Sequence, residues 1–170
     1  MRDATDGGKR ADGDRPAVLF VCLGNICRSP LAELAFRLAA AERGLDAVVD
    51  SAGTGDWHVG NAPDPRARAE AARHGHSIDH YRARQVTPAD FARFDHIVAL
   101  DGQNLADLRA MAPAGATARL SLLLDHVPGR AGEGVFDPYH GDAAAFAETW
   151  ADVSAGARGL ADELAAQRSG

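Results

Sequence analysis

The sequence predicts a single α/β domain in which a four-stranded parallel sheet is flanked by helices on both faces. Short, continuous apolar runs, typical of strands buried on both sides, alternate with longer segments whose apolar residues recur at helical spacing. The length of 170 residues fits one domain, and the sequence contains no internal repeat or linker. We expect this domain to span residues 16–170, after a polar, Gly- and Asp-rich disordered tail at residues 1–15.

The first strand, loop and helix carry the clearest pattern. Ala17–Leu23 is an unbroken apolar run and is expected to be a strand, which a short loop connects to a helix. Pro30 is expected at the first helical position, because the N–H that proline lacks would have no partner there. Glu33 and Glu42 are expected on the solvated face of this helix. The helix continues to Gly44, and its apolar face is formed by Leu31, Leu34, Ala35 and Leu38.

The remaining elements follow in the same alternation. Further strands are expected at Asp46–Asp50, Phe94–Leu100 and Arg119–Leu124. Further helices are expected at Pro65–Gly75 with Asp64 as its cap, around Phe91 after Thr87–Asp90, and from the cap Asp101 to Ala112. A long C-terminal helix is expected to have an apolar face formed by Phe146, Trp150, Val153, Ala157, Leu160 and Leu164.

The composition argues against several classes of protein. The net charge is −6 and both signs are interleaved, so no basic stripe can follow a nucleic-acid backbone. No apolar run approaches the ~20 residues that span a bilayer, and Met1–Arg15 lacks the apolar stretch of a signal peptide. We therefore expect a cytoplasmic monomer that binds neither nucleic acid nor membrane, with export by a signal-less route left open. The two cysteines, Cys22 and Cys27, suit neither a disulfide scaffold nor a zinc knuckle, so we expect reduced, functional thiols.

The loop between the first strand and its helix carries the pattern Cys22-x5-Arg28-Ser29. Ligands of parallel α/β sheets bind at such strand-to-helix junctions, where unpaired N–H groups at the helix start attract an anion. Gly24 lets the backbone come close, and Asn25 tolerates a left-handed conformation. The loop can therefore turn its amides inward and form a nest for a phosphate group.

These residue types indicate phosphoryl-transfer chemistry. The anion-binding amides favour the ionised thiolate of Cys22, a nucleophile, and Arg28 can add two parallel charged hydrogen bonds to the phosphoryl oxygens. Ser29 can donate to the sulfur and ease its departure as a leaving group. A lone cysteine at the end of a core strand is more often an inert buried thiol, but Arg28 and Ser29 at this spacing favour the catalytic interpretation.

The segment Val21–Glu33 (VCLGNICRSPLAE) resembles the signature of the low-molecular-weight protein tyrosine phosphatases. The resemblance continues in order at Asp50–Thr54, Trp57–Gly60, Asp64–Ala67, Arg73–Gly75, Gln85–Val86, Ala99–Asp101, Asn104–Leu105 and Asp137–Tyr139. It covers the chain from Ala17 to the C-terminal helix. It implies an enzyme that hydrolyses phosphotyrosine in proteins through a phosphocysteine, with no metal or other cofactor.

The resemblance also implies a role for individual residues. Cys22 is the nucleophile, Arg28 the phosphate clamp and Asp137 the general acid and base, although Asp-Pro alone is more simply a turn signal. The substrate-binding residues are Leu23, Gly24, Asn25, Ile26, Cys27, Ser29, Trp57 and Tyr139. A hydrogen-bonded network that supports the loop consists of Asn25, Ser29, Ser51 and His74. Without the resemblance, Trp57 and Tyr139 could equally be packing residues, and the histidine a favourable charge at a helix C-terminus.

Several alternatives follow from the same pattern. An arginine phosphatase of this fold typically has threonine where Ile26 stands, and a branched apolar residue favours a phenyl phosphate over a guanidine. A non-catalytic phosphotyrosine- or oxyanion-binding module would not need both Cys22 and Asp137. A thioredoxin-coupled arsenate reductase would need cysteines after Cys27, and the sequence has none. Cys27 is either a second buried thiol or a protective disulfide partner of Cys22, and His140, where many members have an aromatic ring, leaves the substrate preference of the rim open.

Overall fold

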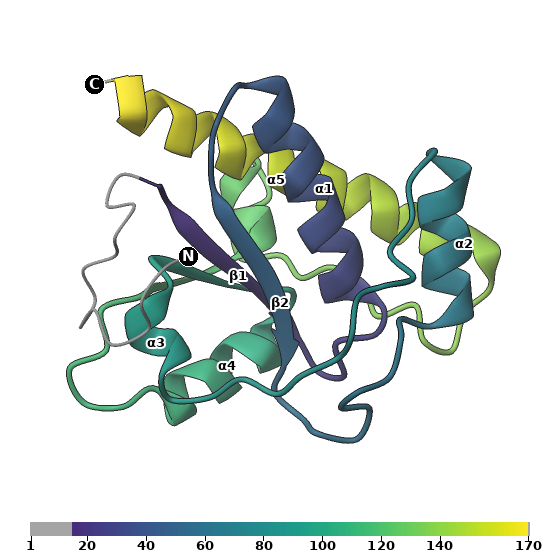
Figure 1. The fold of residues 1–170 in the computed structure, drawn as a ribbon, viewed down its shortest axis with the longest axis horizontal. Coiled ribbons are helices and arrows are strands. Elements are labelled where there is room, and N and C mark those ends of the chain that lie inside the picture. Colours follow the sequence, from purple (N-terminus) through teal and green to yellow (C-terminus); the bar gives the residue numbers. More distant parts are fainter. Residues whose placement is uncertain (1–14, 170) are drawn as a thin grey trace.

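Four parallel strands form one sheet in the order β2-β1-β3-β4 in the computed structural model of the chain (Figure 1). The structure describes residues 15–169, so the tail predicted for residues 1–15 lies, apart from Arg15, outside the described residues. The strands are β1 at Ala17–Cys22, β2 at Val48–Gly53, β3 at His96–Ala99 and β4 at Arg119–Leu122. β1 lies between two neighbours, and all its residues are buried.

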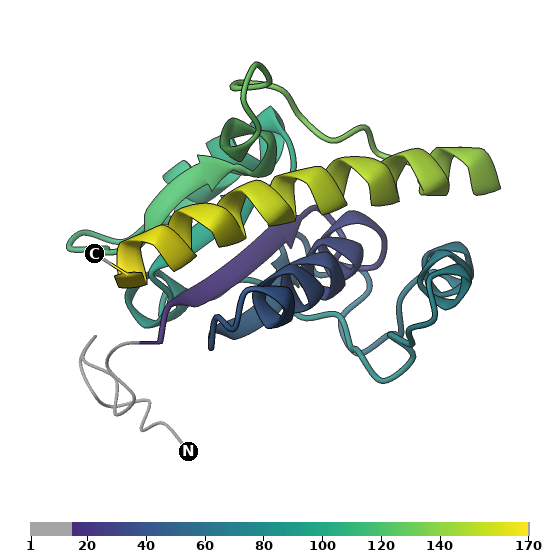
Figure 2. The same ribbon diagram turned by 90° about the horizontal axis from the view of Figure 1, so that it is seen from above.

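Helices cover both faces of this sheet, which confirms the predicted fold class. The helices are α1 at Arg28–Glu42, α2 at Pro65–Arg73, α3 at Asp90–Arg93, α4 at Gly102–Met111 and α5 at Ala143–Ser169. In Figure 1, α1 and α5 lie on one side of the strands and α3 and α4 on the other. Figure 2 shows α5 running along the length of the molecule. α2 packs outside this layer, against α1 and α5.

Alternate residues of β1 point into two separate hydrophobic cores. Val18 and Phe20 belong to the core that contains residues of α1 and α5. Leu19 and Val21 belong to the core that contains residues of α3 and α4. Because both faces of β1 are packed, the loop that follows this strand starts from a fixed position.

The first helix begins earlier than the sequence predicted. Arg28 is its first residue and Cys27 its N-cap, whereas Pro30 was expected to start it. The proline still lies in the first helical turn, where its missing N–H loses no hydrogen bond. The loop therefore passes directly into α1, and its arginine belongs to the helix.

The second strand lies later than predicted, at Val48–Gly53 rather than Asp46–Asp50. It pairs in register with β1 along its whole length, and Cys22 lies opposite Gly53. The prediction stopped at Asp50 because this residue and Ser51 after it are polar, so hydropathy does not show that the strand continues to Gly53. The register places Ser51 and Gly53 beside the loop that follows β1.

The last strand is shorter than predicted and is fastened to α5. A 3-10 turn, η1, occupies Leu123–His126 directly after β4. His126 Nε2 lies 3.0 Å from Ser121 Oγ, and its Nδ1 lies 2.9 Å from the Glu163 carboxylate on α5. Of the helices formed by residues 15–169, none has the length and apolarity to cross a membrane.

Candidate active site

The segment Cys22–Arg28, which we call the phosphate loop, lies at the centre of the sheet's carboxyl edge. The strands on either side of β1 are β2 and β3, so the strand order reverses here, and this is the crevice where parallel α/β sheets bind ligands. Asp101, two residues after the end of β3, lies at the same crevice: its Oδ2 accepts from Arg28 Nη1 at 2.7 Å. Two strand ends therefore contribute to one site.

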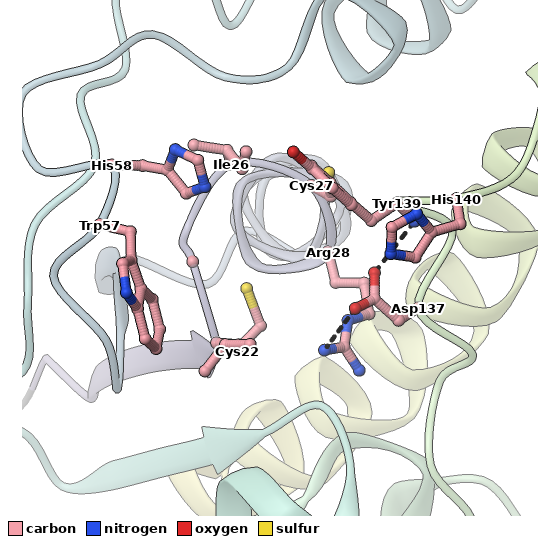
Figure 3. Close-up of a pocket in the computed structure, with 11 residues that line it drawn as sticks. Cys22, Ile26, Cys27, Arg28, Trp57, His58, Asp137, Tyr139 and His140 are labelled. Atoms are coloured by element: carbon pink, nitrogen blue, oxygen red, sulfur yellow. Dashed lines mark hydrogen bonds and ion pairs between the residues drawn. The ribbon is translucent and has the colours of Figure 1, made fainter.

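A cavity of about 300 Å³ opens above this loop. In Figure 3 the sulfur of Cys22 points into the space between Trp57 on one side and Asp137 on the other. The residues that line the cavity are Cys22, Leu23, Gly24, Ile26, Cys27, Arg28, Trp57, His58, Asp137, Tyr139 and His140. The nucleophile, clamp and acid expected from the sequence thus line one cavity, together with both expected aromatic residues.

The backbone of the phosphate loop leaves its amides free to bind a ligand. Asn25 has a φ of 59° and is the only non-glycine residue at positive φ within residues 15–169, as its residue type predicted. Within the same residues, the main-chain N–H groups of Gly24, Asn25, Ile26 and Cys27 donate to no other protein group. With the start of α1 beside them, these donors suit a phosphate group.

A buried network holds the phosphate loop from behind. Asn25 Nδ2 donates to Ser29 Oγ at 2.8 Å and to Ser51 Oγ at 3.1 Å. The side-chain oxygen of Asn25 accepts from the main-chain N–H of Arg84 at 3.0 Å. Ser29 Oγ lies 3.1 Å from Cys22 Sγ, so this hydroxyl can donate to the sulfur when the thiol is ionised. The left-handed residue and the nucleophile therefore share one support.

The network ends on Glu33, which was wrongly predicted to lie on the solvated face of α1. Glu33 is only 5% exposed; it accepts from Ser51 Oγ at 2.8 Å and from Arg37 Nη2 at 2.7 Å. Burial raises the pKa of Glu33, and the hydrogen bonds from Arg37 and Ser51 oppose that rise. The prediction failed because this face of α1 packs against β2 rather than water.

Gly53 permits a close approach between β2 and the phosphate loop. A Cβ atom at Gly53 would lie 2.6 Å from the Leu23 carbonyl oxygen and 3.2 Å from the Asn25 nitrogen. A Cβ atom at Gly24 would instead meet the His58 side chain at 3.0 Å, which can move. The steric need for glycine, expected at Gly24, is therefore greater at Gly53.

Arg28 is a buried cation with one nitrogen anchored. Its Nη1 donates to Asp101 Oδ2 at 2.7 Å and to the Val135 carbonyl at 3.0 Å, and its Nη2 lies 3.7 Å from Asp137 Oδ2. Burial works to lower the pKa of Arg28, but Cys22 and the hydrogen bond to Asp101 outweigh it and raise the pKa above its usual value. The guanidinium thus stays charged and oriented towards the cavity it lines.

The segment Asp137–His140, which we call the acid segment, stands at the rim. The Asp137 side chain is 48% exposed, and its Oδ1 accepts from the main-chain N–H of Tyr139 at 3.1 Å. Arg66 on α2 ties this segment down: its guanidinium lies 5.7 Å from the centre of the Tyr139 ring, and its Nη1 donates at 2.8 Å to the carbonyl of Gly141, which directly follows the segment. A single arginine therefore makes two of the contacts that hold this segment.

Asp64 connects this tie to the phosphate loop. Its carboxylate accepts from Arg66 Nε at 3.0 Å and Nη2 at 2.9 Å, and it caps α2 as predicted by accepting from the Arg66 N–H at 2.8 Å. The main-chain N–H of Asp64 donates to the Ile26 carbonyl at 2.9 Å. The start of α2 thus bridges the phosphate loop and the acid segment.

The two cysteines of the loop are both free thiols in different electrostatic settings. Burial raises the pKa of the Cys27 thiol strongly, and the negative charge of Asp64 adds to the rise. Cys27 therefore stays protonated at neutral pH. Cys22, in contrast, has Arg28 and the Ser29 hydroxyl as neighbours.

Three of the four residues predicted to support the loop share hydrogen bonds behind it: Asn25, Ser29 and Ser51. The side chains of Asn25 and Ser29 are buried there, and the main-chain N–H of Asn25 stays free for a ligand. His74 was expected in the supporting network. It instead pairs with Glu70 Oε2 at 2.7 Å and stacks on Trp150 with ring centres 4.7 Å apart, because the end of α2 packs on α5.

Other functional residues were missed because their roles depend on the tertiary fold. Asp101 was predicted as a helix cap, with a role in shaping the cleft as the less favoured interpretation. It does accept from the Asn104 N–H at 2.8 Å, and its second oxygen accepts from Arg28, a contact that was not predicted. His58 lines the cavity next to Trp57, and no spacing in the sequence singles out this histidine. A signal for Glu33 was present: a charge inside an apolar run, four residues before an arginine.

Comparisons with known proteins agree on one family. The family model described as low molecular weight phosphotyrosine protein phosphatase matches residues 17–169. The low molecular weight protein-tyrosine-phosphatase of Streptomyces coelicolor is 46% identical over 148 residues, which are 84% of this chain and 90% of the relative. The crystal structure of YfkJ from Bacillus subtilis is 41% identical with a TM-score of 0.83 and covers 90% of this chain and 96% of its own.

A solved structure with a different named substrate shares the fold. The crystal structure of DARP, a Drosophila arginine phosphatase, is 32% identical with a TM-score of 0.80 and covers 86% of this chain and 96% of its own. The fold alone therefore does not separate the two kinds of phosphatase. The family model spans nearly the whole described chain, however, and the chain belongs to the low-molecular-weight phosphotyrosine protein phosphatase family.

Proposed function

We propose that this protein hydrolyses phosphotyrosine in proteins through a phosphocysteine intermediate. The observation that carries the proposal is a cavity lined by Cys22, Arg28 and Asp137 (Figure 3). The aromatic rings of Trp57 and Tyr139 line the same cavity. A binding module needs only the amides and the arginine. The nucleophile and a carboxylic acid in the same cavity favour turnover.

In the first step the Cys22 thiolate attacks phosphorus. The S–P bond forms as the bond from phosphorus to the phenolic oxygen breaks, and Asp137 gives its proton to the departing phenolate. The free amides of the loop and Arg28 bind the phosphoryl oxygens and stabilise the charge that redistributes in the transition state.

In the second step water hydrolyses the phosphocysteine. Asp137, now ionised, takes a proton from the water, whose oxygen bonds to phosphorus as the S–P bond breaks. Cys22 leaves as a thiolate, and the Ser29 hydroxyl, 3.1 Å from the sulfur, can donate to it. Free phosphate and the starting enzyme result. We also propose that the protein is cytoplasmic and monomeric.

The alternative is phosphoarginine hydrolysis, which has to be considered because the arginine phosphatase DARP has a similar structure. Ile26 lines the cavity with a branched apolar side chain, and Trp57 and Tyr139 add aromatic surface. A flat phenyl ring suits this apolar and aromatic part of the lining better than a polar guanidine does. Phosphotyrosine is therefore the favoured substrate.

Turnover of an aryl phosphate tests the chemistry. We expect the wild type to release p-nitrophenol with or without a chelator, and Cys22→Ser to lose activity by at least roughly 10⁴-fold. Equal rates for wild type and Cys22→Ser, or abolition by the chelator, would contradict the mechanism. Matched phosphotyrosine and phosphoarginine peptides then decide the substrate, and a higher kcat/KM for phosphoarginine would overturn the assignment.

A further inference from the structure

The large exposed apolar side chains of the described residues either line the cavity or directly adjoin a lining residue in the sequence. Within the described residues there are five of them: Leu23, Trp57, Val59, Phe136 and Tyr139. Three of these line the cavity, and the other two adjoin lining residues in sequence. Apolar residues scattered singly over a surface need no explanation, but a group around one site marks a binding surface.

The cavity itself explains only part of this group. Val59 is 54% exposed and Phe136 is 74% exposed, yet neither lines the cavity. A volume of about 300 Å³ is at the small end for ligand pockets and suits one phenyl phosphate. A small ester that fills the cavity would therefore leave both side chains in water.

The two side chains follow opposite walls of the cavity along the chain. Val59 comes two residues after Trp57, and Phe136 directly precedes Asp137. Figure 3 shows Trp57 and Asp137 on opposite sides of the Cys22 sulfur. A ligand that extends beyond the cavity in both directions would thus meet an apolar residue on either side.

We propose that Val59 and Phe136, which we call the apolar rim, bind apolar side chains on both sides of the phosphotyrosine in a polypeptide substrate. This inference rests on the proposed function and names its substrate class. In an extended peptide, residues two positions apart point to the same face and lie about 7 Å apart. The rim is therefore expected to contact the side chains at positions −2 and +2 relative to the phosphotyrosine.

The test compares phosphotyrosine peptides of equal length and charge that carry leucine or serine at positions −2 and +2. For the wild type we expect kcat/KM to be about tenfold higher for the leucine peptide, as partial burial of apolar surface would give. Val59→Ser and Phe136→Ser should each reduce this preference, because each removes one of the two apolar contacts. Phe136→Leu, which keeps an apolar side chain, should retain it.

Hydrolysis of p-nitrophenyl phosphate separates this inference from the proposed function. The rim variants should hydrolyse this small ester at the wild-type rate, because it does not reach the rim. Two results would overturn the rim proposal and leave the proposed phosphatase activity standing. One is an equal kcat/KM of the wild type for the two peptides, and the other is an equal loss of kcat/KM on both peptides in the rim variants. If the wild type fails on p-nitrophenyl phosphate as well, the proposed function itself falls.

A second copy of this chain is the rival occupant of the rim. Sedimentation of the wild type and of Val59→Ser/Phe136→Ser distinguishes the two. We expect both to sediment as monomers. A dimer that the double variant abolishes, together with no preference between the peptides, would assign the rim to self-association and overturn the proposal.

Discussion

The phosphate loop and the acid segment face the same cavity but are held in opposite ways. The loop rests on buried side chains: Asn25 is 3% exposed and Ser29 is fully buried. The acid segment stands at the rim, with Asp137 half exposed and with Arg66 as a tie from outside. The loop is therefore part of the folded core, whereas the acid segment is attached to it.

This difference separates two parts of the chemistry. In the proposed mechanism the loop binds phosphoryl oxygens whatever the leaving group is, so damage to it should slow all esters equally. In the same mechanism the acid segment protonates the leaving group, so damage to it should matter most for a poor leaving group. Phenyl phosphate and p-nitrophenyl phosphate, whose phenolate leaves readily, make the distinction measurable.

Among variants that keep the Cys22 nucleophile, the largest effect is expected from Arg28→Lys in the loop. A lysine cannot make two parallel hydrogen bonds, so kcat/KM should fall on the order of 10³-fold for both esters. Arg43→Lys, at the far end of α1, is the matched control and should keep the wild-type rate. A loss below tenfold would show that Arg28 is not the principal clamp.

The next effect concerns the two thiols within the loop. Because the pKa of Cys27 is raised by burial and by Asp64, Cys27 should stay protonated as the pH rises from about 7 to 9, where an ordinary thiol begins to ionise. Iodoacetamide should then modify Cys22 at least about 10²-fold faster than Cys27. Mass spectrometry of tryptic peptides measures both rates, and comparable labelling would contradict the electrostatic difference.

In the acid segment, Asp137→Asn keeps the shape but removes the proton. We expect kcat for phenyl phosphate to fall by roughly 10²-fold, and kcat for p-nitrophenyl phosphate to fall by much less. Rates for the two esters measured side by side give the ratio. If both esters lost the same factor, Asp137 would be acting on phosphate binding and not on the leaving group.

A smaller change should follow from loss of the support behind the loop. Asn25→Ala leaves a left-handed backbone without its side-chain ties and should lower the free energy of unfolding by about 2 kcal/mol and kcat by roughly tenfold for both esters. Asn25→Gly relieves the backbone strain and should recover part of the stability but not the rate. Urea unfolding and steady-state kinetics measure the two quantities, and an unchanged stability of Asn25→Ala would contradict the role of the network.

The parts of the structure that could be predicted from the sequence are those that depend on neighbouring residues. Strand, loop and helix are local patterns, so the order of elements, the left-handed Asn25 and the cap at Asp64 were all predictable from neighbouring residues. The register of β2 was not, because polar residues in this strand hide it from hydropathy. Consequently the burial of Glu33 against β2 was missed.

The ties between distant segments were also out of reach. Asp101 reaches Arg28 across a sequence separation of 73 residues, and no spacing within the chain indicates that contact. His74 shows the reverse error: resemblance suggested a place in the network, but stacking on Trp150 of α5 takes the ring elsewhere. Local chemistry was predictable, and the tertiary partners of each group were not.

The smallest effect is expected from Arg66→Met, which removes the external tie of the acid segment. Without the bond to the Gly141 carbonyl and the contact with the Tyr139 ring, Asp137 should be less well placed, and kcat for phenyl phosphate should fall about fivefold with little change for p-nitrophenyl phosphate. Arg68→Met is the matched control on α2, since Arg68 donates to the Pro63 carbonyl and not to the acid segment.

A double variant decides whether Arg66 acts through the acid. In an Asp137→Asn background, Arg66→Met should have no further effect on phenyl phosphate, because no proton remains to be placed. A fivefold loss in that background would mean that Arg66 supports the cavity as a whole. The acid segment would then be coupled to the fold as closely as the phosphate loop is.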